Sequence, residues 1–254
     1  MNGLIAELAR LTGQADEVIL HVALVFMRVG AAVFLLPALG EMALPRRVRL
    51  GAAVTITLVL APAVPQGSTP GMVEFVSEAV TGLALGMGLR LFILGLQTAG
   101  AMAAQSTSLA QMFSGTGPEP QPAIASLLTL GGLALFVTMG GLERSVALLL
   151  QSYEMVPAGR MLVPGDLAHW GIARVARVFA LAFALAAPFL IAALLYNLTL
   201  GVINRAMPML MVALIGAPAL TLGGLVLLAA TAPLMLEIWG SSIDAALARG
   251  PAGG

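Results

Sequence analysis

Residues that could do chemistry are few in this chain, and none of them forms a catalytic or metal-binding pattern. His21 and His169 have no second ligand at metal-binding spacing, and the chain has no cysteine. Gly86-Met87-Gly88 lacks the third glycine of a dinucleotide-binding turn, and a Walker-type phosphate loop needs a lysine, which this chain does not contain. The sequence therefore predicts neither an enzyme nor a bound cofactor or metal.

Charges inside long apolar segments are the more informative residues. Arg28 lies in the apolar run 22–37, where a guanidinium needs a carboxylate, backbone carbonyls or water. We expect Arg28 to tie helices or subunits together, with snorkelling to an interface as the alternative. Arg90 is a second candidate of this kind. Glu74 and Glu78 form an i, i+4 pair, for which we expect a solvent-exposed helix face, with a proton relay as the alternative.

Composition places the chain among membrane proteins. It has 254 residues, of which 59% are hydrophobic and only 9% are charged, whereas soluble domains have about 25% charged residues. Twelve basic and twelve acidic residues give a net charge of zero, so nothing predicts binding to nucleic acid.

The elements that must carry these residues are apolar segments, and we expect an all-α membrane protein built of long kinked helices and helical hairpins. The segments cover residues 18–39, 48–64, 72–112, 122–156, 168–203 and 206–239. A membrane crossing needs about 20 apolar residues, so the third, fourth and fifth segments are too long for one straight crossing each. The basic cluster Arg46, Arg47 and Arg49 would lie in the cytoplasm by the positive-inside rule.

The break between the last two apolar segments is short and polar. Asn204, Arg205 and Pro208 separate them, and such residues are costly in lipid unless protein or water receives them. We therefore expect a helical hairpin that packs into an assembly, with these three residues at its bend.

A polar stretch lies in the middle of the chain. Uncharged polar residues precede Met112 and Phe113, and a flexible Ser114-Gly115-Thr116-Gly117 segment follows them. Neutral polar side chains beside deformable methionine suit the wall of a conduit, whereas an ordinary surface loop is the alternative. The residues of this candidate plug are Gln111, Met112, Phe113, Ser114, Gly115, Thr116 and Gly117.

Several of these features, in this order, resemble the FliR family of flagellar export-gate proteins, whose injectisome relatives are called SctT. The matching residues are Arg28, Pro37, Pro45-Arg46-Arg47-Val48-Arg49-Leu50-Gly51, Ala61-Pro62, Thr98-Ala99-Gly100, Asn204-Arg205, Pro208 and Ile215-Gly216-x-Pro218. The chain departs from the family at 115–120, where relatives often have a hydrophobic and Asp-Pro pattern. It departs again at Gly140-Gly141-Leu142, where many have Asn-Gly-His.

The resemblance implies a non-enzymatic subunit of a type III protein-export gate. One such chain is expected to join five FliP-like and four FliQ-like subunits and an FlhB-like switch protein, in the inner membrane at the flagellar basal body. Residues 1–160 would resemble a FliP-like subunit that carries the plug loop, and residues 161–254 a FliQ-like hairpin. The cargo would be unfolded flagellar proteins, and Arg28, Arg46, Arg47, Arg90, Asn204, Arg205 and Pro208 would be buried or assembly residues.

Two alternatives stay open at this point. A secondary transporter for a small solute would use a broken helix such as 204–208 as a midplane site, but it predicts an inverted repeat that the sequence does not display. An injectisome subunit is the second alternative, although the overall resemblance is closer to the flagellar proteins.

Overall fold

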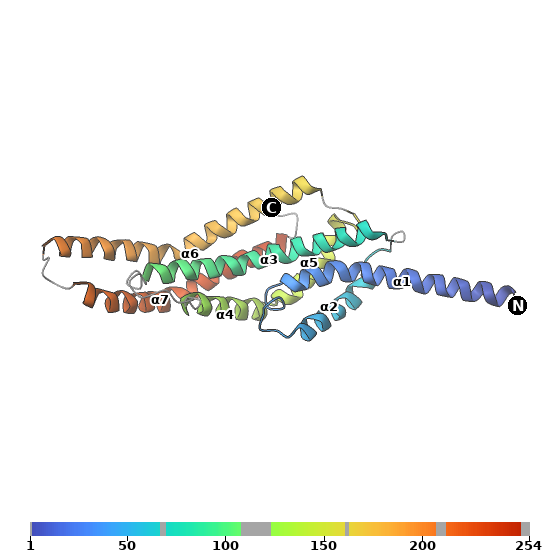
Figure 1. Ribbon diagram of the computed structural model, residues 1–254, viewed down its shortest axis with the longest axis horizontal. Helices are drawn as coiled ribbons and strands as arrows, with labels where there is room; N and C mark the ends of the chain where they lie inside the picture. Colours follow the sequence, from blue (N-terminus) through green and yellow to red (C-terminus); the bar gives the residue numbers. More distant parts are fainter. Residues whose placement is uncertain (1, 67–69, 108–122, 161–162, 207–211, 250–254) are drawn as a thin grey trace. The chain divides into compact units, whose positions relative to one another are not determined.

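A computed structural model describes residues 2–66, 70–107, 123–160, 163–206 and 212–249, and all regular structure in these ranges is helical (Figure 1). The helices are α1 (Asn2–Leu35), α2 (Arg46–Leu60), the short 3-10 helix η1 (Ala61–Ala63), α3 (Met72–Thr107), α4 (Ala123–Thr138), α5 (Gly141–Met155), α6 (Pro164–Ala206) and α7 (Val212–Arg249). The all-α prediction is confirmed for the described residues.

Among the described residues, four helical stretches are long and apolar enough to cross a membrane. They are Ala15–Leu35, Met72–Ser106, Pro164–Ala206 and Leu220–Arg249. Helices α4 and α5 qualify only together, as a broken span or a re-entrant pair of helices. Gly140 lies at the break, and its φ of 72° favours glycine. Of the three overlong apolar segments, one is thus a broken pair, and in the other two the described residues form a single long helix each.

The length of α6 exceeds what a bilayer requires. Its 43 residues extend for about 65 Å at 1.5 Å per residue, whereas the hydrocarbon core is about 30 Å thick. Pro188 lies inside this helix, where proline removes one hydrogen bond of the i to i−4 series. The helix therefore reaches well beyond the hydrocarbon, bends strongly, or packs against protein along part of its length.

The residues group by contact into two units. The first comprises residues 1–90, 139–174 and 244–254, and the second comprises residues 91–138 and 175–243. The grouping follows spatial contact and not chain order, so the predicted halves 1–160 and 161–254 stay a prediction.

Close helix packing through small residues organises the first unit. Helix α1 packs against α2 and η1. The first half of α3 lies against α1 at Gly82 and Gly86: a Cβ at Gly82 would overlap the backbone of Arg28, and one at Gly86 would lie 2.7 Å from the carbonyl oxygen of Ala32. Glycine at these positions lets the two helix backbones approach. This approach brings the charged side chains described below within reach of each other.

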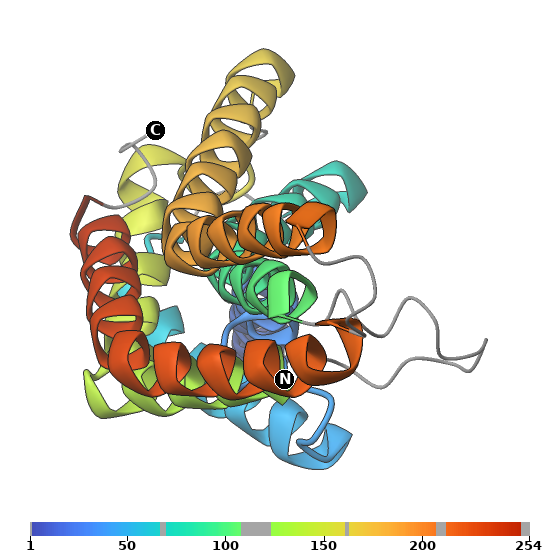
Figure 2. The same ribbon diagram turned by 90° about the vertical axis from the view of Figure 1, so that its left-hand side faces the viewer.

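In the second unit, the C-terminal half of α3 lies between α6 and α7, as Figures 1 and 2 show. Gly95 of α3 faces Val178 of α6, and Gly100 faces Ala125 of α4. The indole nitrogen of Trp239 in α7 is fully buried and donates a hydrogen bond to the carbonyl oxygen of Phe92, at 2.8 Å. Small-residue contacts and the buried hydrogen bond from α7 to α3 therefore both help to hold this unit together.

Candidate functional site

A buried ion pair joins α1 to α3 in the first unit. The Nε of Arg28 donates to Oε2 of Glu78 at 2.7 Å, and its Nη2 donates to Oε1 at 2.8 Å. Both side chains are fully buried. This two-point geometry matches the planar guanidinium to the carboxylate and is the strong form of the interaction.

The remaining polar atoms of the pair find partners on and after α5. Nη1 of Arg28 donates to the hydroxyl of Ser152 at 3.0 Å, and Nη2 also donates to the carbonyl oxygen of Val156 at 2.9 Å. The guanidinium carbon lies 3.8 Å from the centre of the Tyr153 ring, a cation–π contact. The pair is therefore embedded in a polar cluster made by three helices.

Glu78 also fixes the turn that leads from α5 to α6. It accepts a hydrogen bond from the backbone nitrogen of Gly159 at 2.9 Å, and Gly159 has a φ of 78°, which favours glycine. The neighbouring Ser77 hydroxyl donates to the carbonyl oxygen of Arg160 at 2.6 Å. One turn of α3 thus holds both the guanidinium of α1 and the backbone after α5.

The chemistry of this cluster is structural. Two charges removed from water need excellent geometry and partners for their polar atoms, and here each nitrogen of the guanidinium and each carboxylate oxygen has at least one partner. The residues that the structure describes include no group of three or more histidine, cysteine or acidic side chains that could hold a metal ion. The cluster acts as an internal tie, and it resembles neither a substrate site nor a metal site.

Glu78 corrects one expectation from the sequence. We expected Glu74 and Glu78 to share a solvent-exposed face, but Glu78 is fully buried, while Glu74 is partly exposed. The expectation was wrong for Glu78 because helix spacing describes α3 alone, whereas α1 covers this face. A signal was available: Arg28 requires a carboxylate, and Glu78 is an acidic residue within an apolar helix. Nothing in the sequence marked Ser152, Tyr153 or Gly159.

The other predicted arginines lie nearer the surface of the chain. Arg90 pairs with Glu41 at 2.5 Å, and about a fifth of each side chain is exposed. Arg49 donates from Nη2 to the backbone oxygen of Glu41 at 2.7 Å. Arg46 and Arg47 are exposed at the start of α2. Their predicted role in assembly stays a prediction.

The residues predicted for the bend of the hairpin are only partly described. Helix α6 continues through Asn204 and Arg205 and ends at Ala206, so both residues belong to the last turn of a helix. Both are exposed. Pro208 lies outside the described residues, as does the whole candidate plug 111–117.

Comparison with known proteins finds relatives that match most of this chain. Residues 19–246 match the model of a family described as bacterial export proteins, family 1. A flagellar biosynthetic protein FliR of Caulobacter vibrioides is 34% identical over 226 residues, which cover 85% of this chain and 90% of the relative. FliR of Escherichia coli is 29% identical, with 82% and 83% covered, and FliR of Aquifex aeolicus is 27% identical, with 87% and 88% covered.

These matches extend over most of the chain, and the family match includes every residue of the buried cluster. They support a structural membrane component of the flagellar export apparatus and not an enzyme. The chain belongs to family 1 of the bacterial export proteins, the family of the flagellar FliR proteins.

Proposed function

We propose that this chain is one subunit of a protein-export gate in the bacterial inner membrane at the flagellar basal body. In the proposed gate it joins five FliP-like and four FliQ-like subunits, with an FlhB-like switch protein beside them. The gate would conduct unfolded flagellar proteins, with energy supplied by other components.

The observation that carries this proposal is the exposed apolar surface at the far end of α6. No side chain from residue 194 to residue 206 is buried, and Leu194, Leu198 and Val202 form one stripe with about two thirds of each side chain exposed. Val226 of α7 is 70% exposed. A continuous stripe of exposed apolar side chains marks a surface that lipid or another protein covers.

Two physical features favour partner subunits over lipid for much of this surface. Helix α6 is about twice as long as a hydrocarbon core requires, and it ends in the exposed polar residues Asn204 and Arg205. Such residues are acceptable where protein or water receives them. We infer that Asn204, Arg205 and Pro208, together with Arg47, contact neighbouring subunits.

The composition of the assembly provides the direct test. The full chain, co-expressed with its FliP-like and FliQ-like partners, is purified and its intact mass is measured. A mass that corresponds to one copy of this chain, five FliP-like subunits and four FliQ-like subunits supports the proposal. A chain that purifies alone and transports a small solute would instead support a secondary transporter, for which the exposed Asn204 and Arg205 form no enclosed site.

The plug is a separate part of the proposal. We infer that residues Gln111 to Gly117 seal the closed channel, because neutral polar residues beside Met112 and Phe113 can close around varied cargo without binding it. Deleting residues 112–117 should leave the assembly intact and make the closed channel conduct ions. Replacing Met112 and Phe113 by serine, at constant loop length, separates the sealing side chains from the loop. An unchanged resting conductance in both variants would show that these residues do not seal the channel.

A further inference from the structure

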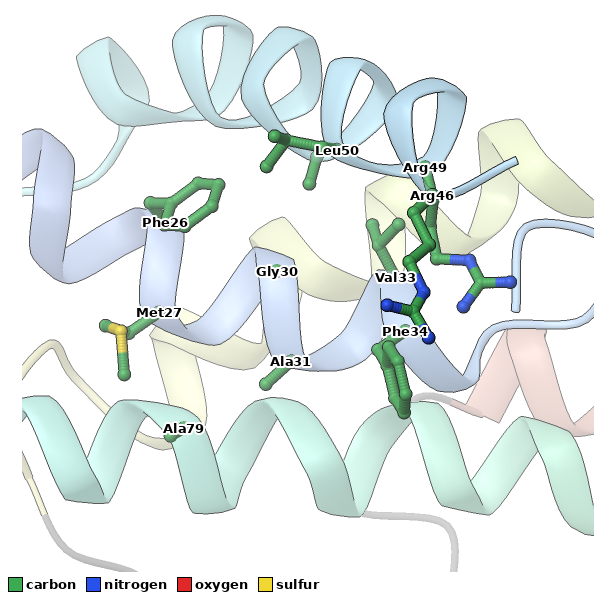
Figure 3. A pocket seen from close by; sticks show the side chains of 11 residues that line it. Phe26, Met27, Gly30, Ala31, Val33, Phe34, Arg46, Arg49, Leu50 and Ala79 are labelled. Carbon is green, nitrogen blue, oxygen red and sulfur yellow. The ribbon is translucent and has the colours of Figure 1, made fainter. Parts of the chain in front are cut away.

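A cleft between α1 and α2 has an apolar wall and a cationic end. Its volume is about 450 Å³, within the range of roughly 300–1,000 Å³ of small-molecule sites. Phe26, Met27 and Leu50 are among the apolar residues that line it. Figure 3 shows the guanidinium groups of Arg46 and Arg49 at one end, beside Phe34.

The two guanidinium groups lack an anionic partner. In the described part of the chain, neither Arg46 nor Arg49 forms a salt bridge, and the Nε of Arg49 is buried without a hydrogen-bond partner. The nearest acid in sequence, Glu41, gives its carboxylate to Arg90 and only its backbone oxygen to Arg49. A buried donor without a partner is unfavourable unless a ligand supplies an acceptor.

The arginines do not stabilise helix α2 either. The first turn of α2 contains Arg46, Arg47 and Arg49 and no acidic residue. Cations at a helix N-terminus oppose the helix dipole. The arginines therefore destabilise the free end of α2, and an anion bound there would offset this effect.

The apolar part of the cleft continues onto a surface suited to lipid. Leu50, Val54 and Leu58 form an i, i+4, i+8 stripe along α2, and about half of each side chain is exposed. Helix α2 has 15 residues and is about 22 Å long, too short to cross a hydrocarbon core of about 30 Å. An acyl chain could thus lie in the cleft and continue along this stripe.

A protein helix fits the cleft poorly. A helix with its side chains is about 10 Å across, so roughly 450 Å³ holds little more than one turn of it. Gly30 keeps the floor of the cleft open, and a Cβ there would make only ordinary contact, 3.6 Å from the ring of Phe26. A flexible chain suits this shape better than a preformed helix.

We propose that the α1–α2 cleft binds an anionic phospholipid, with its phosphate between Arg46 and Arg49 and one acyl chain against Phe26, Met27 and Leu50. The ligand is recognised by its charge at one end of the cleft and by its hydrocarbon along the remainder. The lipid would thereby complete the interface between α1 and α2.

The charge requirement is tested with the purified full chain in nonionic detergent, by native mass spectrometry with added phosphatidylglycerol. We expect one tightly retained lipid, and we expect R46Q/R49Q to weaken its binding by about tenfold or more, because two charge-assisted contacts are lost. Arg47 is the matched control, since it lies between the two on the same helix but does not line the cleft. R47Q should change the affinity by less than about twofold, because the side chain of Arg47 does not line the cleft and makes no contact with the bound phosphate.

The site itself is tested with phosphatidylglycerol that carries a photoreactive group on one acyl chain. Crosslinks should fall on residues 26–34 and 50, and G30L should abolish them because its side chain fills the cleft. The control G51L changes a glycine that lies outside the cleft and has open space, with no atom within 4 Å, where a Cβ would be, so crosslinking should persist. Unchanged circular dichroism of every variant shows that the helices remain folded.

Three results would overturn the proposal. Diacylglycerol could bind as tightly as phosphatidylglycerol, which would remove the role of the arginines. Inorganic phosphate could compete as well as the lipid, which would reduce the site to an anion site. In the assembled complex, the cleft could crosslink to a neighbouring subunit and not to lipid, which would make it a protein interface.

Discussion

The buried pair of Arg28 and Glu78 yields the sharpest stability prediction. Replacing Glu78 by glutamine preserves the side-chain size but removes the negative charge, which leaves the guanidinium of Arg28 buried without a counter-charge. The two charge-assisted contacts of 2.7 and 2.8 Å are lost or weakened, while those to Ser152 and Val156 remain. Breaking a buried pair in this way costs about 3–5 kcal/mol, and the two retained contacts place E78Q near the lower end, at about 3 kcal/mol.

A double-mutant cycle separates the pair from the packing around it. R28M removes the other charge, keeps an unbranched apolar side chain and should also cost about 3 kcal/mol. The double variant R28M/E78Q contains neither charge, so it should be about as stable as either single variant, which corresponds to a coupling energy of roughly 3 kcal/mol.

The assay is reversible unfolding of the purified full chain in mixed micelles of mild and denaturing detergent, followed by far-UV circular dichroism. Arg144 supplies the control, because the side chains of its pair with Asp244 are 51% and 41% exposed. R144Q should therefore cost no more than about 1 kcal/mol. The reasoning fails if E78Q costs as little as R144Q, or if the effects of R28M and E78Q simply add.

Two further predictions concern packing and one buried hydrogen bond. G82A should destabilise the first unit by about 1–3 kcal/mol, because the new Cβ overlaps the backbone of Arg28; G51A, where nothing lies within 4 Å, should be neutral or slightly stabilising in the same unfolding assay. W239F should cost about 1–3 kcal/mol, because the carbonyl oxygen of Phe92 loses its buried donor and a smaller ring leaves a gap. Equal unfolding midpoints for G82A and G51A would contradict the close packing at Gly82. Equal unfolding midpoints for W239F and the unmodified chain would contradict a stabilising role for the Trp239 hydrogen bond.

The sequence determined the fold class and indicated one residue of the buried cluster around Arg28 and Glu78. Hydropathy alone specifies helices of membrane length, because an apolar segment must satisfy its own backbone hydrogen bonds in lipid. It also marked Arg28, since a guanidinium in an apolar run demands a partner. The order of polar residues and prolines then indicated the family, which the comparisons confirmed.

Only the tertiary structure decided which partner Arg28 takes. Glu78 lies 50 residues away and Ser152 lies 124 residues away, and local periodicity contains no information on such pairs. The choice depends on how closely α1 and α3 approach, and Gly82 and Gly86 set this distance because they have no side chain to hold the backbones apart. Helix spacing alone suggested a solvated Glu78, whereas the covering helix α1 buried it. The sequence determines what each segment needs, and the packing of distant segments determines which residue meets that need.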